Sequence, residues 1–565
     1  EDSSKSVAAS TANLHLLSWN VAGWKTSVEQ IRRFAGGLEA FVQRHQADVL
    51  CLQEVKLASK VLATDGKQLG ADLAGYDSFW ACNEGSGAQR QGLNGVATFA
   101  RKGTVLRADS APLGSPELDG EGRCLLTDHG AFVLFNVYVP NSSSGSRLHF
   151  KLRWLNALRA SMQKERAAGK AVIVAGDLNM KSRLQDVHWS WRPVRASCLK
   201  SVREGAPEDL EPEVHTQLLA VAAVWDQLLQ ALRAKEHRPI ETRNPRSGQV
   251  FQKWGIYARP FRPGGGPPLG GDEAENAEFV RLGPPVDSED SARGSFLVDG
   301  MGVEADGEIV LGAAALSATF LLREPGELCL GDLAEGLRKL AGIELSSKAV
   351  QWLAARATGP GTPPPVRDWL EAVLREDGMV DSFAELYPTA EERFTCWDQY
   401  RNKRHDNEGS RIDYVLVDRS FFAQYAVRGA GLDAQRHPRP ECAAAALAAA
   451  KLGGLSQPSP FAGGGMPELF QDEYFAQFRA DSEGPSTGMV YTPPQLSDHI
   501  AVTLLLQALP CQGQIHCDGS APRDPATARC QPHRSTRRIT DFFGARKAAV
   551  PGPMPPGKRR ALGAG

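Results

Sequence analysis

The chain has 565 residues, of which 42% are hydrophobic and 23% charged, and its formal net charge is -2 at pH 7. This length allows several domains, or one large domain with insertions. No run of about 18 apolar residues occurs, which argues against a membrane-spanning helix. The ten scattered cysteines favour a reduced, intracellular setting over a disulfide-rich secreted one.

Short apolar runs alternate with longer helical stretches in the first third of the chain. The runs LHLLSWN, ADVLCLQE, GVATFAR, FVLFNVYVP and AVIVAGD are typical of β-strands. The stretches SVEQIRRFAGGLEAFVQRHQ and SRLHFKLRWLNALRASMQKERAAGK have helical character. The pattern returns at 375–432 with RIDYVLVD and at 490–508 with HIAVTLLLQ. Strands that alternate with helices predict a layered α/β domain.

Two segments interrupt this pattern. Residues 195–370 contain the Pro/Gly-rich stretches RPFRPGGGPPLGGDEAENAE and ATGPGTPPP around one helical piece, LCLGDLAEGLRKLAGIELSSKAVQWLAARA. We interpret residues 195–370 as one large, partly disordered insertion of unknown role. Residues 433–485, rich in Ala and Gly, form a second, low-complexity insertion. We expect a flexible N-terminus at 1–13 and a disordered basic tail at 509–565. Between them, one α/β domain is divided into three parts, at 14–194, 371–432 and 486–508. The two insertions, at 195–370 and 433–485, separate these parts.

Polar side chains recur where the predicted strands begin or end. They are Asn20, Glu54, Tyr138, Asp177, Asn179, Asp413, Asp498 and His499. A single Asp after a strand is usually turn chemistry. Six such places, rich in Asp, Asn, Glu and His, instead predict an active site in the loops at the sheet edge.

The residue types indicate the chemistry of this site. Carboxylate and carboxamide oxygens suit a hard cation such as Mg²⁺, and a His beside an Asp suits proton transfer or a contact to a phosphate oxygen. The sequence has no Cys₄ or His₃ zinc pattern and no GxxxxGK[ST] phosphate-binding loop. Metal-assisted phosphodiester hydrolysis is the reaction class that fits.

The motifs LLSWNVAGW, DVLCLQEVKL, FNVYVPNS, VIVAGDLNM, GSRIDYVLVD and LSDH occur in an order that resembles the exonuclease III-like AP endonucleases of the endonuclease/exonuclease/phosphatase superfamily. The stretches EGRCLLTDHGAFVLFNVYVPNS, GMVDSFAELYP and RFTCWDQYRNKRHDNEGSRIDYVLVD resemble the second, clamp-associated class of eukaryotic AP endonucleases. This resemblance covers about 14–190, 375–432 and 490–508. It implies a four-layered α/β sandwich, in which two packed β-sheets are flanked by helices, with large, partly disordered insertions.

The resemblance also implies a metal site. Glu54 would be the principal Mg²⁺ ligand, Asn20 and Asp498 would lie near the ion, and Mn²⁺ would be a substitute. The full implied metal set is Asn20, Glu54, Asp177, Asn179, Asp498 and His499.

The same resemblance implies catalytic roles around a phosphate. Asp177 would orient or deprotonate the attacking water, and Asn179 would help to hold the pentacovalent phosphate. Tyr138 and His499 would contact that phosphate, and Asp413 would orient His499.

The implied reaction is hydrolysis 5′ to an abasic site in double-stranded DNA, with 3′–5′ exonuclease and 3′-end-cleaning activities, in nuclear base excision repair. Two alternatives stay open. One is a phosphoesterase of the same superfamily that acts on a non-DNA substrate, and the other is a catalytically weak scaffold that binds DNA and the clamp. The stretches FTCW and NEGSRIDY favour DNA, because they resemble the repair branch.

The chain departs from this family at several positions. Ala22 stands where many relatives place an Asp or Asn near the metal, which predicts weaker metal affinity. Ser144 stands where some relatives place an Arg that inserts into DNA. Cys396 and Trp397 are expected at the wall of the abasic-sugar pocket, although Trp397 fits a core aromatic equally well.

The tail from residue 509 is basic, with ten Lys or Arg against three Asp, a local balance of +7. In RSTRRITDFFGARK, Ile539, Phe542 and Phe543 have the spacing i, i+3, i+4, which places three apolar side chains on one face of a helical turn. This resembles the peptide that docks on the sliding clamp of replication, proliferating-cell nuclear antigen, with Thr536 in place of the usual Gln. Basic neighbours would add attraction to an acidic clamp or to DNA phosphates.

Two further tail features remain open. A zinc site is one interpretation of five residues with irregular spacing, Cys511, His516, Cys517, Cys530 and His533. The basic run Gly557 to Arg560 fits a nuclear import signal and a solvated chain end equally well.

Overall fold

A computed structural model describes residues 11–84, 92–142, 147–205, 210–243, 248–261, 279–282, 327–390, 392–398, 403–404, 407–427, 487–490, 492 and 496–510. The predicted clamp-binding residues, the tail cysteines and histidines, the basic run at 557–560, Ser144 and the 433–485 insertion lie outside these residues. Within them, no helix is long and apolar enough to cross a bilayer.

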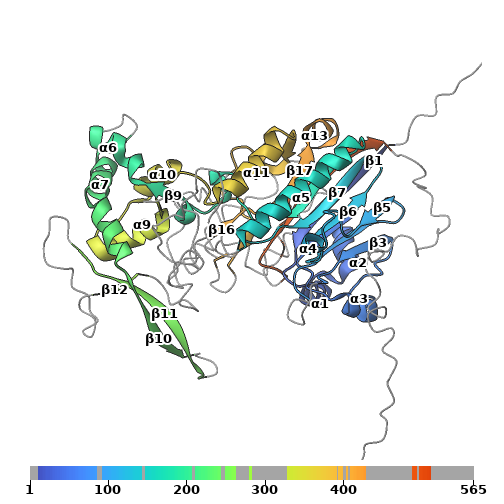
Figure 1. Cartoon of the computed structure of the whole chain (residues 1–565), viewed down its shortest axis with the longest axis horizontal. Helices are drawn as coiled ribbons and strands as arrows, with labels where there is room; N and C mark the ends of the chain where they lie inside the picture. Colours follow the sequence, from blue (N-terminus) through green and yellow to red (C-terminus); the bar gives the residue numbers. More distant parts are fainter. Residues whose placement is uncertain are drawn as a thin grey trace, which may run out of the picture. The chain divides into compact units, whose positions relative to one another are not determined.

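Two mixed six-stranded sheets form the centre of the fold (Figure 1). The first has the strand order β18-β19-β1-β2-β4-β3. Its strands are β18 (Gly488–Val490), β19 (Ala501–Pro510), β1 (Thr11–Asn20), β2 (Val49–Gln53), β4 (Val96–Arg101) and β3 (Tyr76–Ala81). Only the β1–β2 pair is parallel in this sheet, as the structure describes it.

The second sheet has the order β14-β17-β8-β7-β6-β5. Its strands are β14 (Met379–Asp381), β17 (Asp413–Asp418), β8 (Ala171–Asp177), β7 (Phe132–Tyr138), β6 (Cys124–Asp128) and β5 (Arg107–Asp109). Here β7 and β8 are parallel and the remaining described pairs are antiparallel. Each sheet thus joins chain segments that are several hundred residues apart.

Successive side chains of a strand point to opposite faces of a sheet, so a strand that is apolar throughout is buried on both faces. In β8, Ile173 and Ala175 lie in the hydrophobic core between the sheets, whereas Val172 and Val174 face helices on the other side. In β1, Leu16 faces the second sheet and Leu17 faces helices. Strands buried in this way read as continuous apolar runs, as these do.

Helices cover the two outer faces. The first sheet packs against α1 (Trp24–Ala35) and α2 (Leu38–Arg44), and the second against α5 (Leu148–Ala167) and α11 (Pro364–Arg375). Shorter helices are α3 (Ser59–Asp65), α4 (Pro116–Asp119), α12 (Ser382–Leu386) and α13 (Arg419–Tyr425). Helix, sheet, sheet and helix make the four-layered α/β sandwich that the motifs predicted.

The first predicted helical stretch is broken in two. Gly36 and Gly37 have φ values of 79° and 111°, which favour glycine and end α1 before α2 begins. The strand β1 begins at Thr11, three residues before the expected start of the domain.

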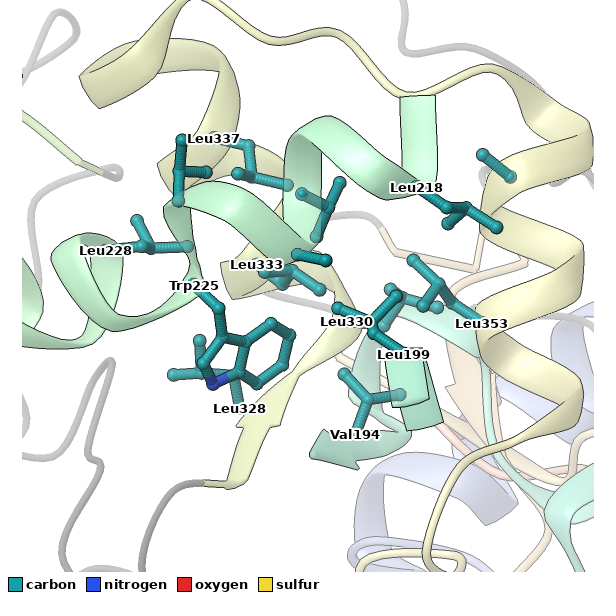
Figure 2. Packing of buried hydrophobic residues seen from close by; sticks show 14 of the residues in the cluster. Val194, Leu199, Leu218, Trp225, Leu228, Leu328, Leu330, Leu333, Leu337 and Leu353 are labelled. Carbon is teal, nitrogen blue, oxygen red and sulfur yellow. The ribbon is translucent and has the colours of Figure 1, made fainter. Parts of the chain in front are cut away.

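The 195–370 segment contains a hydrophobic core of its own (Figure 2). Its helices are α6 (Lys200–Glu204), α7 (Pro212–Arg233), α9 (Leu330–Gly336) and α10 (Ser347–Ala355), with a π-helical turn at Leu337–Ala341. Trp225 of α7 lies beside Leu328 and Leu333 from the predicted helical piece, and Leu353 belongs to the same cluster. The long helix α7 was not predicted from the sequence, although its apolar residues have helical spacing.

Short strands complete this part of the chain. The hairpin β10 (Glu236–Arg243) and β11 (Val250–Ala258) continues into β12 (Val280–Arg281). The strand β13 (Glu327–Cys329) pairs with β9 (Pro193–Arg195), which joins the start of the segment to the strand that precedes α9. The two-residue strands β15 (Cys396–Trp397) and β16 (Gly409–Ser410) pair with each other and come shortly before β17 in the sequence.

Gly176, the residue before Asp177 at the end of β8, is required by the close approach of the neighbouring strand. It has a φ of 144°, and a Cβ built there would lie 2.0 Å from the carbonyl oxygen of Val137 on the neighbouring strand. Only glycine allows β7 and β8 to approach this closely while β8 turns into the loop that carries Asp177.

We therefore expect Gly176→Ala to destabilise the protein by about 3 kcal/mol or more, because strain and a backbone clash add. Gly169→Ala is the matched control, since Gly169 also has a positive φ, 82°, but has nothing within 4 Å of the added Cβ. That control should lose only about 1 kcal/mol. Urea unfolding of both variants measures the difference, and equal losses would contradict the argument.

Candidate active site at the shared edge of the two sheets

The predicted site residues lie at one edge of the sandwich because of strand direction. The parallel strands β1 and β2 end beside each other at Asn20 and Gln53, and Glu54 follows immediately. In the second sheet, Tyr138 and Asp177 are register partners at the ends of β7 and β8.

Two antiparallel strands begin at this same edge. Asp413, the first residue of β17, is the register partner of Asp177, and Asp498 and His499 lie two to three residues before β19. Segments separated by up to about 480 residues therefore meet, as the hydrogen bond from Trp19 Nε1 to the His499 carbonyl also shows (3.2 Å).

Asn20 links the carboxylates of the two sheets. Its Nδ2 donates to Glu54 Oε1 at 3.0 Å and to Asp177 Oδ2 at 3.0 Å. Its Oδ1 accepts from the backbone N–H of Ala22 at 3.0 Å. In this geometry Asn20 positions the two carboxylates, since its oxygen is already used by the backbone.

The backbone around these residues is held in the left-handed region. Ala22, Glu54, Lys56, Asn94 and Asn179 have φ values of 51°, 53°, 50°, 56° and 49°. Non-glycine residues adopt this conformation at a cost of about 1–3 kcal/mol each, and such residues concentrate at functional sites.

The loop after β8 is fixed by its own polar groups. The backbone N–H of Asn179 donates to Asp177 Oδ1 at 2.8 Å, and Asn179 Nδ2 donates to the Val139 carbonyl at 2.9 Å. Lys151 Nζ, from the buried face of α5, donates to the Asn179 carbonyl at 2.7 Å. The AspLeuAsn turn is therefore held from β8, from the end of β7 and from α5.

His499 is paired with Asp413. The distance from His499 Nδ1 to Asp413 Oδ2 is 2.8 Å, and both side chains are buried. Burial lowers the pKa of His499, but Asp413 and Cys396 together outweigh burial and raise that pKa well above 6.5. Asp413 thus orients the ring and favours its charged form, as a phosphate contact requires.

Burial and like charges raise the pKa of Asp177. Burial is the largest cause, Asp413 and Glu54 add to it, His499 opposes it, and the pKa reaches about 7. Burial also raises the pKa of Tyr138 well above its usual range, with further contributions from Glu54 and Asp177. Burial and neighbouring carboxylates therefore disfavour the charged form of Asp177, and a bound cation would relieve that cost.

Glu54 differs from Asp177 in its electrostatics. Burial raises its pKa, but hydrogen bonds from Lys56 and Asn20 outweigh burial and keep the pKa below 4.5. Lys56 Nζ lies 2.9 Å from Glu54 Oε2 and donates to the Ala22 carbonyl at 3.0 Å. The ammonium group thus joins Glu54 to the backbone of Ala22.

The donor set fits a hard divalent cation. Ligand atoms of Glu54, Asp177 and His499 all lie within 4.8 Å of one another, and two of the three are carboxylates of the kind Mg²⁺ binds. Asp498 lies farther along the same edge, where Ser497 Oγ joins its Oδ1 (3.3 Å) to the Asn20 carbonyl (2.7 Å).

The two residues expected at the sugar pocket have different environments. Trp397 is 2% exposed and packs in the core between the sheets, where its Nε1 donates to Asn407 Oδ1 at 3.1 Å. Cys396 is half-buried and lies beside His499 through an antiparallel bridge.

Three basic residues of the site were missed in the sequence analysis. Lys56 is two residues beyond Glu54, and Arg123 lies 4.6 Å above the Tyr138 ring and donates to its carbonyl. Lys151 shares the helical spacing of Trp154, Leu155 and Leu158, which are buried in α5. The sequence could have indicated Lys151, because a lysine on the apolar face of a predicted helix needs a buried polar partner.

Comparison with known proteins places the chain. Residues 17–267 match the model described as the Endonuclease/Exonuclease/phosphatase family. The chain is 30% identical over 216 residues to DNA-(apurinic or apyrimidinic site) endonuclease 2 of Bos taurus, a match that covers 31% of this chain and 40% of that protein. It is 33% identical over 174 residues to DNA repair nuclease APEX1 of Danio rerio, covering 30% and 50%.

Solved structures give a match of wider extent and lower identity. The crystal structure of the Xenopus laevis APE2 catalytic domain aligns with 88% of this chain and 94% of that chain, at 15% identity and a TM-score of 0.41.

These matches confirm the resemblance that the motifs indicated: residues 17–267 are similar to the endonuclease/exonuclease/phosphatase family. Within that family the chain is similar to exonuclease III-like AP endonucleases, DNA-(apurinic or apyrimidinic site) endonuclease 2 among them. The sequence matches span half or less of the length of these curated relatives.

The raised pKa of Asp177 predicts a pH-dependent stability difference. Because the folded protein binds this proton more tightly than the unfolded chain, wild-type stability declines as pH rises from about 4 to about 7 without metal. Asp177→Asn removes the buried charge and should therefore be more stable than wild type by about 1–3 kcal/mol at pH 8. This gain should shrink towards pH 5.

Urea unfolding in EDTA at pH 5, 6.5 and 8 measures this difference. Asp65→Asn, at an exposed position of α3, is the matched control and should show no trend. A stability difference for Asp177→Asn that does not change with pH would contradict the assignment of a raised pKa.

Proposed function

We propose that this protein is a divalent-metal-dependent DNA repair nuclease that hydrolyses phosphodiesters on the 5′ side of abasic sites and at 3′ ends. The observation that carries the proposal is the meeting of Glu54, Asp177, Asp413 and His499 at one sheet edge, in a chain that matches the family model over 17–267. Relatives named as an apurinic or apyrimidinic site endonuclease and as a DNA repair nuclease support DNA as the substrate.

The chain's own residues divide the work on a phosphodiester. Asp177, held by Asn20 and the N–H of Asn179, is placed to orient and deprotonate a water. Burial raises the pKa of Asp177 above its ordinary value, which favours proton acceptance. As Asp177 takes a proton from the water, the water oxygen would bond to phosphorus and form the pentacovalent phosphate. The bond from phosphorus to the leaving 3′ oxygen would then break, and that oxygen would take a proton from solvent to become the 3′-hydroxyl.

Other groups would stabilise charge that develops on the phosphate. His499, charged because of Asp413, would contact a non-bridging oxygen, and Asn179 and Tyr138 would donate to the same phosphate. Such fixed donors favour the transition state over the ground state, because the phosphate oxygens gain charge during attack.

Mg²⁺, or Mn²⁺ as a substitute, would be held by Glu54 with Asp177 and His499 nearby, and would neutralise charge on the phosphate and the leaving oxygen. Asn20 would keep the two carboxylates apart at hydrogen-bonding distance from its own amide. Lys56 offers a fixed charge where Ala22 supplies no ligand, which supports weaker metal binding than in relatives with an acid at that position.

The site test is Asp177→Asn. It should lower the rate of cleavage of an abasic duplex by about 10²–10⁴-fold, because the general base is lost, and leave DNA affinity nearly unchanged. Gel assays and fluorescence anisotropy measure the two quantities, with Asp65→Asn as control.

The substrate test compares abasic duplex, 3′-blocked duplex and mismatched-primer duplex, each with Mg²⁺, Mn²⁺ or EDTA. We expect metal-dependent cleavage of abasic and 3′-blocked DNA. If wild type cuts none of them, the scaffold that binds DNA and clamp is the better interpretation. If wild type instead hydrolyses a non-DNA phosphodiester, the better interpretation is a phosphoesterase of the same superfamily.

We propose further that the tail docks on the sliding clamp and that the enzyme acts in the nucleus. Changing Phe542 and Phe543 to Ala should remove clamp binding, because the two rings supply most of the apolar surface of the motif. Val550→Ala, in the same tail but outside the motif, should leave binding unchanged. Calorimetry with the purified clamp measures both, and equal affinity of the double variant and wild type would refute docking through this motif.

A further inference from the structure

A second group of metal-ligating side chains lies next to the oxygen-donor set. It consists of Cys396, Asp498 and His499, whose ligand atoms all lie within 4.8 Å of one another. Two of these residues come from the edge of the first sheet, and Cys396 comes from β15. None of the phosphodiester chemistry above uses the Cys396 sulfur.

The backbone holds the three residues together. Cys396 and His499 face each other in an antiparallel bridge. On either side of that bridge, the N–H of Ile500 donates to the Thr395 carbonyl at 2.9 Å, and the N–H of Trp397 donates to the Asp498 carbonyl at 3.2 Å. Side chains directly opposite in such a pair have Cβ atoms about 4.5–5.5 Å apart, so the thiol and the imidazole are neighbours by construction.

The imidazole is oriented for a ligand on its other nitrogen. Asp413 Oδ2 lies 2.8 Å from His499 Nδ1, so Nε2 is the ring nitrogen left for a ligand, and the Cys396 thiol interacts with the ring. A carboxylate that accepts from one ring nitrogen while the other binds metal is the usual outer arrangement of zinc-binding histidines.

Sulfur decides which ion suits this group. Mg²⁺ takes oxygen ligands, whereas thiolate, imidazole and carboxylate together are the ligands of Zn²⁺, at bond lengths of about 2.0–2.3 Å. Three protein ligands also leave a fourth tetrahedral position for water or another small ligand. Ligands around zinc lie roughly 3.5 Å apart by these bond lengths, so modest side-chain rotations would close the group.

We propose that Cys396, Asp498 and His499 form a binding site for a thiophilic divalent ion of the zinc type, and that occupation of this site inhibits the enzyme. Inhibition follows because an ion on Nε2 removes His499 from the phosphate. It would also remove His499 from the oxygen-donor set with Glu54 and Asp177. The inhibitory part rests on the proposed function, and the binding part does not.

Binding exchanges protons for the ion. Burial raises the pKa of Cys396 to about 11, so the sulfur is a thiol at neutral pH. As the sulfur–metal bond forms, the S–H bond breaks and its proton goes to solvent, together with the Nε2 proton of a charged His499. No electron is transferred.

The binding test uses Co²⁺ as a spectroscopic probe on the full chain in Mg²⁺-free buffer. Wild type should show a cobalt–thiolate charge-transfer band, and Cys396→Ser should lose the part of it that Cys396 supplies. Cys198→Ser, at a half-buried cysteine of the insertion, is the matched control and should retain the wild-type band. Thiols of the tail are the same in all three proteins and cancel in the difference.

A second measurement needs no variant. Alkylation of wild type with iodoacetamide, followed by peptide mass spectrometry, should show that equimolar Zn²⁺ protects Cys396 and does not protect Cys198. This readout and the cobalt spectrum are independent of nuclease activity, so they stand even if no DNA substrate is cleaved.

The inhibition test titrates Zn²⁺ at fixed excess Mg²⁺, with each protein compared with its own uninhibited rate. Half-inhibition of Cys396→Ser should need at least about tenfold more Zn²⁺ than that of wild type, the lower end of what the loss of a metal-site partner costs. The proposal is overturned if the cobalt band is the same in Cys396→Ser and wild type, or if Zn²⁺ leaves Cys396 as reactive as before. Equal Zn²⁺ inhibition of the two proteins overturns the inhibitory part alone.

Discussion

The side-chain amide of Asn20 is the contact on which the site depends. It belongs to the first sheet and donates at 3.0 Å both to Glu54 of that sheet's edge and to Asp177 of the second sheet. The two carboxylates repel each other in a buried setting, and an unpaired buried carboxylate is costly. The Asn20 amide between them, with Lys56 beside Glu54 and His499 beside Asp413, stabilises the two buried carboxylates.

Polar pairs elsewhere keep the two sheets in one register. Between the sheets, Gln53 Nε2 donates to Asn136 Oδ1 at 2.8 Å, and Asn136 Nδ2 donates to the Ala97 carbonyl at 2.8 Å. Arg411 is fully buried between Asp186 (2.8 Å) and Asp381 (2.6 Å) two residues before Asp413. A slip between the sheets would leave such groups unpaired, so they fix the relative position of the strand ends that carry the site.

The same edge has two kinds of donor set within a few ångströms. Glu54 and Asp177 supply oxygen, Cys396 supplies sulfur, and His499 is a member of both sets. Hard and soft ions therefore compete for one imidazole, and the ion that is present decides whether that imidazole faces a phosphate. The helical core of the insertion is separate from these groups, since its leucines and Trp225 pack with one another (Figure 2).

Sequence alone determined a layered α/β domain and the chemical character of its edge, because buried strands read as apolar runs and polar groups follow them. The four-layered sandwich was implied by the resemblance of the ordered motifs to a known family. Sequence could not determine that Asn20 turns its amide nitrogen to both carboxylates or that Lys56 and Lys151 approach the site. Nor could it show that α7 completes a core with a helical piece more than a hundred residues away. These features depend on contacts between distant segments, and local periodicity carries no record of such contacts. The pairing of Cys396 with His499 is of this kind: each residue is unremarkable in its own stretch, and only the folded chain makes them neighbours.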